Sequence, residues 1–361
     1  MLKTILILVF LSLFLSGAFA SETKSLKQPV ENSAEVTALI EEGIALHNAR
    51  KYDEAISKYC QALEMNPHNP LALYEISYTY YYRENYDSAR SYIERASEYN
   101  GPHLSNALVL LGNTASIMGD YNEAIAAYDR GLDFQPDYFM LNFNKGLVYS
   151  KMSESKKAAE CYKKAVISEP THSSSHLALA QEYENLNCRV PCILAFCRFL
   201  ILEPGTRRAA EALSELQNLL MAGVEKTADS VIKVNVNYTE DNPEGDFTAI
   251  NLMIGLYGAS RLNEENKDKH PIEQIYDALD GIFGMMNSTA SGEERSGLAW
   301  KYYAPYFNEM YNRELVRPFV YYIFQLSDDP IIQSWLTENE EKVNEFLEWS
   351  NSYRFPIGAL Q

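Results

Sequence analysis

The sequence predicts an all-α protein: an α-solenoid of five helical hairpins with a capping helix, followed by a second helical domain. Two observations predict this fold class. Prolines recur at steps of 34 or 35 residues through the first half of the 361-residue chain, at Pro67, Pro102, Pro136, Pro170 and Pro204. Apolar and aromatic residues recur at helical spacing in the last third. A fixed period of about 20–50 residues is typical of arrays in which each repeat is one supersecondary unit.

The first 20 residues have the pattern of a secretory signal peptide. Lys3 precedes an apolar run over residues 5–15, and the small residues Ala18 and Ala20 flank Phe19 as in a cleavage site. The run is too short to cross a bilayer. We therefore expect cleavage near Ala20, a flexible segment over residues 21–35, and an extracytoplasmic mature protein, periplasmic or secreted, that does not span the membrane.

Two further ladders share the period of the prolines. Small residues recur at Gly43, Ser77, Gly112, Gly146 and Ala180, and larger ones recur at Tyr59, Ile93, Tyr128, Tyr162 and Phe196. Small residues are needed where two helices cross closely, and a large side chain fills the space beside each crossing. Proline ends the second helix because it has no amide donor and clashes with the preceding turn. These spacings predict consecutive hairpins of two amphipathic helices.

On these three ladders, residues 36–204 resemble five successive tetratricopeptide repeats. The chain departs from the family pattern where a tryptophan is often found early in the first helix, since it has Leu39, Leu73, Leu108, Asn142 and His176 there. The resemblance implies a right-handed solenoid in which the first helix of each hairpin lines a concave groove. It also implies a protein or peptide as the partner.

The register that the resemblance implies gives six candidate residues of a peptide-binding groove: Tyr74, Tyr78, Tyr81, Asn113, Phe143 and Gln181. The same register includes His47 and Tyr82. Tyrosine offers a large contact area and a hydroxyl at low entropic cost, and asparagine amides can pair with a peptide backbone. The alternative is that some of these tyrosines pack between helices. The basic residues with which some family members clamp a terminal carboxylate are missing beside Asn113 and Asn144.

The segment after the repeats is expected to close the solenoid. Residues 205–225 predict a capping helix with one apolar face, formed by Ala209, Leu213, Leu216 and Leu220. Residues 226–243 are expected as a linker, although the alternation of valines within them fits a short strand equally well.

Residues 244–361 predict the second helical domain, with helices over 247–262, 271–287, 298–311, 314–326 and 338–349. The third and fourth of these carry a dense aromatic stripe, which fits either a packed core or a pocket or partner surface. This third resembles C-terminal regions found behind similar repeats in exported bacterial proteins of unassigned function.

Composition and motifs narrow the function. A net charge of −18 argues against a nucleic-acid partner, because such proteins need a basic surface. The five cysteines are an odd number, and Cys188, Cys192 and Cys197 are close enough for a local disulfide, although small buried side chains are the alternative. Neither a catalytic motif nor a set of cofactor or metal ligands is found in the sequence.

We therefore predict a non-enzymatic interaction module or scaffold that holds a protein or peptide in the groove. Two alternatives remain open at this stage. The C-terminal domain could be a small enzyme or ligand-binding domain carried by the repeats, or the whole protein could be a self-assembling structural subunit. The sequence does not decide its oligomeric state.

Overall fold

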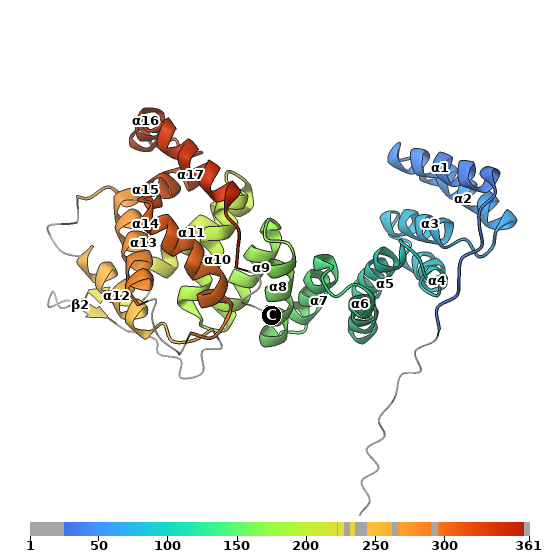
Figure 1. Ribbon diagram of the computed structural model, residues 1–361, viewed down its shortest axis with the longest axis horizontal. Coiled ribbons are helices and arrows are strands. Elements are labelled where there is room, and N and C mark those ends of the chain that lie inside the picture. The colour runs from blue at the N-terminus through green and yellow to red at the C-terminus, as the bar shows by residue number, and fades with distance from the viewer. Residues whose placement is uncertain are drawn as a thin grey trace, which may run out of the picture.

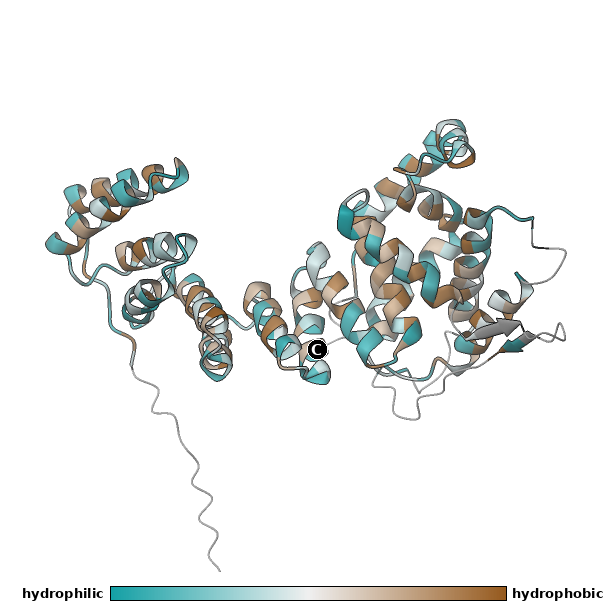
Figure 2. Cartoon of the chain, turned by 180° about the vertical axis from the view of Figure 1, so that it is seen from behind, coloured by the Kyte–Doolittle hydropathy of each residue, from teal (hydrophilic) through white to brown (hydrophobic). Residues whose placement is uncertain are grey.

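A computed structural model describes residues 25–221, 223–226, 232–234, 244–261, 266, 268–289 and 295–356. The predicted signal peptide over residues 1–20 lies outside the described residues. Helices account for nearly all of the described elements, and they form an elongated array that ends in a thicker C-terminal group (Figure 1). Hydrophobic and hydrophilic residues alternate around most helices, as amphipathic helices require (Figure 2).

The five predicted hairpins are present, and the all-α solenoid is confirmed. We number them hairpins 1 to 5 in chain order. They pair α1 (Ala34–Asn48) with α2 (Tyr52–Met65), α3 (Pro70–Tyr82) with α4 (Tyr86–Ala96), α5 (Leu104–Met118) with α6 (Tyr121–Phe134), α7 (Phe139–Lys151) with α8 (Ser155–Ser168), and α9 (Ser173–Asn185) with α10 (Arg189–Leu202).

The small-residue ladder lies where the two helices of a hairpin cross. A Cβ atom added at Gly43, Gly112 or Gly146 would overlap the ring of the tyrosine that faces it from the second helix. In hairpin 2 the small residue is Ser77, whose hydroxyl donates a 2.7 Å hydrogen bond to the Ala89 carbonyl. The period of the sequence is therefore a packing period: a small residue on one helix makes room for a large one on the next.

The turn inside each hairpin has its own repeated feature. Arg50, Glu84, Ser153 and Asn187 all adopt φ values between 56° and 59°, and Gly119 takes the equivalent place in hairpin 3 with φ 88°. Glycine adopts this left-handed conformation without steric cost, whereas the other four residues carry a strain of about 1 kcal/mol each. The tight turn fixes the conformation even where the side chain does not favour it.

The segment ahead of α1 is held against hairpin 2. For residues 21–35 the sequence indicated flexibility, but the described part, from residue 25, runs extended along the chain near Tyr99. The Lys27 amide donates to the Glu98 carbonyl and the Lys27 carbonyl accepts from the Asn100 amide, both at 2.8 Å. These backbone hydrogen bonds are independent of side-chain identity, so the sequence pattern carried no sign of them.

A capping helix and a small hairpin follow the repeats. Helix α11 spans Arg207–Met221, and strands β1 (Val224–Lys226) and β2 (Ile232–Val234) pair antiparallel. Part of the range expected as a linker is thus a strand, which was the alternative that its alternating valines allowed. Val234 packs against Gly255 of the next helix. The rest of the predicted linker lies outside the described residues.

The C-terminal group comprises α12 (Thr248–Ser260), α13 (Pro271–Ser288), the π-helical turn η1 (Ala299–Tyr303), α14 (Ala304–Asn312), α15 (Val316–Ile323), α16 (Pro330–Glu338) and α17 (Glu340–Ser352). Two of the predicted ranges need correction. The helix expected over 314–326 is shorter, and the helix expected over 338–349 begins at Glu340 after a separate helix, α16. Asp329 starts α16, since its carboxylate accepts a 2.9 Å hydrogen bond from the Ile331 amide.

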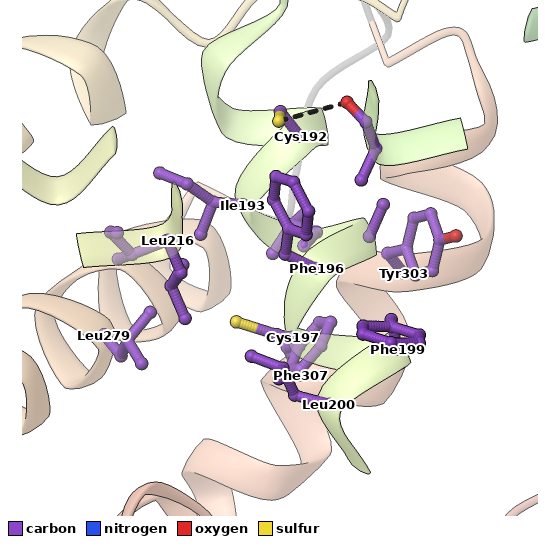
Figure 3. Packing of buried hydrophobic residues seen from close by; sticks show 14 of the residues in the cluster. Cys192, Ile193, Phe196, Cys197, Phe199, Leu200, Leu216, Leu279, Tyr303 and Phe307 are labelled. Carbon is purple, nitrogen blue, oxygen red and sulfur yellow. Dashed lines mark hydrogen bonds between the residues drawn. The ribbon is translucent and has the colours of Figure 1, made fainter. Parts of the chain in front are cut away.

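One hydrophobic core joins the last hairpins to the C-terminal group. Every residue of α10 from 190 to 201 is buried, and its side chains lie between Leu216 of α11, Leu279 of α13 and Phe307 of α14 (Figure 3). The aromatic stripe contributes to this core, with Tyr302, Tyr303, Tyr306 and Phe307 fully buried. The packing therefore continues across the predicted domain boundary at residue 244.

None of the five cysteines forms a disulfide. Four are buried, and Cys192 donates a 3.2 Å hydrogen bond to the Ala180 carbonyl. The local disulfide that the spacing of Cys188, Cys192 and Cys197 left open is absent. These residues instead serve as small side chains in the core, which was the alternative interpretation.

Candidate peptide-binding groove

The first helices of successive hairpins form one continuous face of the solenoid. Helix α1 contacts α3, α3 contacts α5, and α5 contacts α7. Side chains that share a register on these helices therefore line up from one hairpin to the next. Five of the six predicted site residues lie on α3, α5 and α7, and Gln181 lies on α9, the first helix of hairpin 5.

Aromatic rings concentrate on this face at hairpins 1 and 2. Tyr74, Tyr78 and Tyr82 are spaced four residues apart on α3, so they share one side of the helix. Tyr78 stacks on Tyr74, with ring centroids 5.9 Å apart, and meets the edge of Tyr82 at 4.8 Å. His47 of α1 stacks on Tyr78 at 5.2 Å. We refer to His47, Tyr74, Tyr78 and Tyr82 as the aromatic cluster.

Hydrogen bonds link the members of the cluster, and burial shifts the pKa values of two of them. The His47 Nδ1 atom lies 2.8 Å from the Thr79 hydroxyl, and the Tyr78 hydroxyl donates to that of Tyr82 at 3.1 Å. Burial lowers the pKa of His47 and raises the pKa of Tyr74 to about 12. The cluster thus presents an imidazole whose neutral form burial favours, together with tyrosine rings that have both apolar faces and hydrogen-bonding hydroxyls.

A carboxylate lies next to these rings. Glu75 is half-buried, and burial raises its pKa to about 7. Burial raises the pKa values of Tyr59 on α2 and of Tyr74 and Tyr78 on α3, and the charge of Glu75 is a smaller cause of the same shifts. In the described part of the chain no lysine, arginine or histidine forms an ion pair with Glu75. The site therefore contains an ionisable acid that is partly removed from water without a neutralising partner.

The predicted residues do not all come together. Tyr81 lies beside the cluster, 6.4 Å from Tyr82 between ring centroids, and also meets Tyr86. Asn113 is engaged within its own hairpin, where its side-chain carbonyl accepts a 2.7 Å hydrogen bond from the Tyr128 hydroxyl.

The remaining two lie farther along the array. Phe143 on α7 packs against Tyr162 and His172, and Gln181 is exposed on α9. The structure thus gathers the tyrosines of hairpin 2 into one site and leaves Phe143 and Gln181 outside it. His47 and Tyr82 belong to the groove register predicted from the sequence. Glu75 lies outside that register and was not predicted as a site residue. The sequence feature that could have pointed to it is a single acidic residue among tyrosines.

A separate cavity of about 410 Å³ lies between α11, α12 and α13. Polar groups in its lining include Arg261 and Gln274, each with one buried side-chain atom that has no hydrogen-bond partner. The hydroxyl of Ser260, also in the lining, donates to the Tyr257 carbonyl at 2.9 Å. The cavity has the size of a small-molecule site.

Two searches of the described residues gave negative results. Nowhere in them do three His, Cys, Asp or Glu side chains gather closely enough to hold a metal ion. Within the same residues, none of the helices combines the length and apolar character needed to cross a membrane.

Comparison with known families identifies the repeats. A family model described as "Anaphase-promoting complex, cyclosome, subunit 3" matches residues 48–131, one described as "TPR repeat" matches 112–153, and one described as "Tetratricopeptide repeat" matches 141–172. Together with the five hairpins, these matches show that the chain contains tetratricopeptide repeats. The fold is that of a protein-interaction scaffold.

Curated relatives match the repeat region. The "Small glutamine-rich tetratricopeptide repeat-containing protein 2" of Mycosarcoma maydis is 31% identical over 121 residues, which are 34% of this chain and 34% of the relative. The "Probable UDP-N-acetylglucosamine--peptide N-acetylglucosaminyltransferase SPINDLY" of Hordeum vulgare is 29% identical over 150 residues, 39% of this chain and 16% of the relative. The chain thus spans about a third or less of the length of these relatives.

Solved structures also match this part of the chain. A crystal structure of MamA protein is 23% identical with a TM-score of 0.41, and covers 46% of this chain and 90% of its own. The pilF protein of Pseudomonas aeruginosa is 17% identical with a TM-score of 0.46, and covers 51% of this chain and 86% of its own.

Proposed function

We propose that the protein is a non-catalytic scaffold that acts outside the cytoplasm and binds an extended polypeptide on the groove face of hairpins 1 and 2. The observation that carries this proposal is the aromatic cluster. Three tyrosines and a histidine share one face there, and Tyr82 leaves 54% of its surface exposed.

The cluster suits a peptide because it combines area with hydrogen bonding. Rigid aromatic side chains lose little conformational entropy on binding, so their contact area contributes efficiently to affinity. The hydroxyls of Tyr78 and Tyr82 can pair with the carbonyls of an extended backbone. Exposed apolar side chains continue along the first helices at Ile117 and Leu147, which are 44% and 39% exposed. A peptide longer than one hairpin would therefore find further contacts.

The C-terminal group supports the far end of the array in this proposal. Besides the shared core, a buried ion pair joins the two parts: the Lys163 ammonium of α8 lies 3.0 Å from the Glu244 carboxylate. His176 of α9 adds a 2.7 Å hydrogen bond to the Tyr303 hydroxyl of η1. Rigid attachment at hairpins 4 and 5 leaves hairpins 1 to 3 to present the groove.

The proposed location depends on the signal-peptide pattern of residues 1–20. A fusion of the native N-terminus to alkaline phosphatase, which is active only after export in bacteria, tests it. We expect activity with residues 1–20 present and a loss of activity when Leu8 and Leu11 in the apolar run are replaced by Arg. Equal activity of both fusions would contradict export by this segment.

Site-specific photo-cross-linking tests the groove. A benzophenone amino acid at Tyr82 should capture a discrete partner in the native compartment, whereas the same group at Ser57, exposed on α2, serves as the control. Combining the Tyr82 probe with Tyr74→Ala and Tyr78→Ala should abolish the captured band. A partner captured equally from both positions, or unaffected by the alanines, would contradict the assignment of the groove.

The cavity between α11, α12 and α13 favours a second candidate function, a small-molecule binding site in the C-terminal group. Its volume and its polar lining are the observations in favour. Thermal denaturation against a panel of small organic acids and amines tests it, with Gln274→Leu as the variant that should lose any stabilisation. A panel in which nothing shifts the transition would leave the groove as the sole supported site.

A further inference from the structure

The junction between hairpins 2 and 3 differs from the other junctions of the solenoid. Helix α4 has 11 residues, whereas α2, α6, α8 and α10 have 14 each. In those four hairpins the residue two places before the repeat proline is the last residue of the second helix. In hairpin 2 it is Asn100, which lies four residues beyond the end of α4. Residues 98–100 therefore lie outside the helix and present a short edge of backbone to a pairing strand.

Residues 25–32, which we call the arm, pair with this edge. The Lys27 amide donates to the Glu98 carbonyl and the Asn100 amide donates to the Lys27 carbonyl, both at 2.8 Å, and Lys27 forms a parallel β-bridge with Tyr99. Addition of an extended segment to an exposed backbone edge is a common mode of peptide recognition, in which backbone hydrogen bonds give affinity and pockets for side chains give specificity. The arm is thus bound to the junction in the way that a peptide ligand would be.

Three side chains of the arm meet matching surfaces of the junction. The Lys27 ammonium forms an ion pair with the Glu98 carboxylate and lies 5.6 Å from the centroid of the Tyr99 ring. Leu26 packs against the buried residues of hairpins 2 and 3. Pro29 lines a hollow of about 40 Å³ whose other walls come from the start of α3, the end of α4 and the start of α5. The junction therefore has separate contacts for an apolar residue, the lysine after it, and a proline two places further on.

The arm is bound weakly enough to be exchanged. A single isolated bridge holds its backbone, and in residues 25–30 every side chain except Leu26 is exposed. The Lys27 and Glu98 side chains are 58% and 41% exposed, so their ion pair contributes little. At the other end of the arm, the Asn32 side-chain carbonyl accepts a 3.1 Å hydrogen bond from the Asn66 amide group. This attachment beside α1 keeps the arm at a high effective concentration near the junction.

We propose that this junction is a second polypeptide-binding site, which recognises an extended segment with the pattern Leu-Lys-any-Pro, and that the arm is its built-in competitor. A partner segment with this pattern adds to the edge at residues 98–100 after the arm leaves, and the Glu98 carboxylate selects lysine over an acidic residue at the second position. The site is separate from the aromatic cluster and goes beyond the groove assigned above.

A labelled octapeptide with the sequence of residues 25–32 tests the proposal by fluorescence anisotropy with the full mature chain. Leu26→Ser combined with Lys27→Pro releases the arm, because proline has no amide to donate to Glu98. The peptide should bind this variant at least tenfold more tightly than the wild type, in which the arm occupies the junction. Lys27→Pro alone is a milder second variant and should give a smaller gain.

Two altered peptides separate the backbone contacts from the side-chain contacts. N-methylation at the position of Lys27 keeps the ammonium and removes the amide donor, and should weaken binding at least tenfold. Replacing the same lysine with glutamate should weaken binding as well, and Glu98→Arg in the arm-released chain should restore the affinity for the glutamate peptide. Recovery by this exchange of charges would not occur if the peptide bound elsewhere.

The outcomes distinguish this site from the groove. Tyr74→Ala with Tyr78→Ala in the arm-released chain should leave the affinity for the peptide unchanged. If those alanines abolish binding, the peptide occupies the groove, so the junction site fails while the proposed function stands. Equal affinity for the wild type and the arm-released chain, full affinity of the N-methylated peptide, or no binding to either arm-released variant would also overturn the proposal.

Discussion

Replacing Lys163 with methionine would leave a carboxylate buried without its cation. Glu244 has no exposed surface, and its two carboxylate oxygens contact the Lys163 ammonium at 3.0 Å and the Ala299 amide at 2.9 Å. The pair links α8 of hairpin 4 to the segment ahead of α12 and to the start of η1. Because methionine has a similar length and no charge, the substitution removes the ion pair and leaves the packing of the stem largely in place.

The expected loss can be worked out from the environment of each group. Removing one partner of a buried ion pair costs about 3–5 kcal/mol. Lys163 keeps 14% of its side chain exposed, and the Ala299 amide still stabilises Glu244, so the low end of the range applies. Glu160, the other acid beside Lys163, is 63% exposed, so the loss of its ion pair with Lys163 contributes little to the change in stability. We therefore expect Lys163→Met to destabilise the protein by about 3 kcal/mol.

Urea unfolding followed by tryptophan fluorescence measures this loss where it should occur. All three tryptophans, Trp300, Trp335 and Trp349, belong to the C-terminal group. Lys164→Met, an exposed position on the same helix, is the control and should change stability by less than about 0.5 kcal/mol. Adding Glu244→Gln should make the double variant more stable than the sum of the single losses predicts. A loss below about 1 kcal/mol for Lys163→Met, or strict additivity, would refute the reasoning.

Three further predictions concern packing, titration and the thiols. Gly146→Ala places a Cβ atom 2.5 Å from the Tyr162 ring and should lower the free energy of unfolding in urea by about 1–3 kcal/mol. Adding Tyr162→Leu to the same chain should restore part of that loss. An unchanged unfolding midpoint for Gly146→Ala would contradict the packing. Burial lowers the pKa of His176 to about 3, so below about pH 6.5 the unfolded chain binds a proton that the folded chain does not. Stability should therefore fall by about 2 kcal/mol more in the wild type than in His176→Gln between pH 7 and pH 5, and parallel urea curves would exclude this. Ellman's reagent should titrate about one thiol, Cys60, in the folded protein and all five in urea, because the other four are buried; fewer than five in urea would show a disulfide.

The repeat region could be predicted because its period is a steric requirement. A glycine opposite a tyrosine, as at Gly112 and Tyr128, excludes every larger residue, so the sequence records the crossing directly. Proline at the end of the second helix acts in the same way. The backbone hydrogen bonds that join Lys27 to Glu98 and Asn100 leave no such record, and the ion pair between the Lys27 and Glu98 side chains belongs to no repeated spacing that would predict it.

The C-terminal group was predicted less well because its helices are short and closely spaced. The predicted helix over 338–349 did not include α16, which begins at Pro330 and is separated from α17 by Asn339. The core that joins the last hairpins to the C-terminal group was also not predicted. Its signal was the run of apolar residues in α10, which has no polar face and therefore needs partners on every side.

The candidate site also has one part that the sequence predicts and one part that it does not. A family register identifies which helix face is concave, and this was enough to bring Tyr74 and Tyr78 together. The register does not identify which charged residue beside that face lacks an ion-pair partner, because ion pairing depends on how the neighbouring hairpin packs. The partial burial of Glu75 depends on the packing of α1 and α2 against α3, which the sequence pattern does not describe.

The attachment of the C-terminal group determines which part of the groove remains available. Hairpin 5 is fixed because its second helix, α10, lies inside the shared core, and its first helix is tied to η1 through the buried pair of His176 and Tyr303. Hairpins 1 to 3 have no such covering among the described residues, apart from the short segment near Tyr99. A solenoid held at one end can present the other to a partner without losing rigidity, since each hairpin depends mainly on its neighbours. The aromatic cluster lies at that free end, where an extended segment of a partner could reach it without displacing any part of the chain that the structure describes.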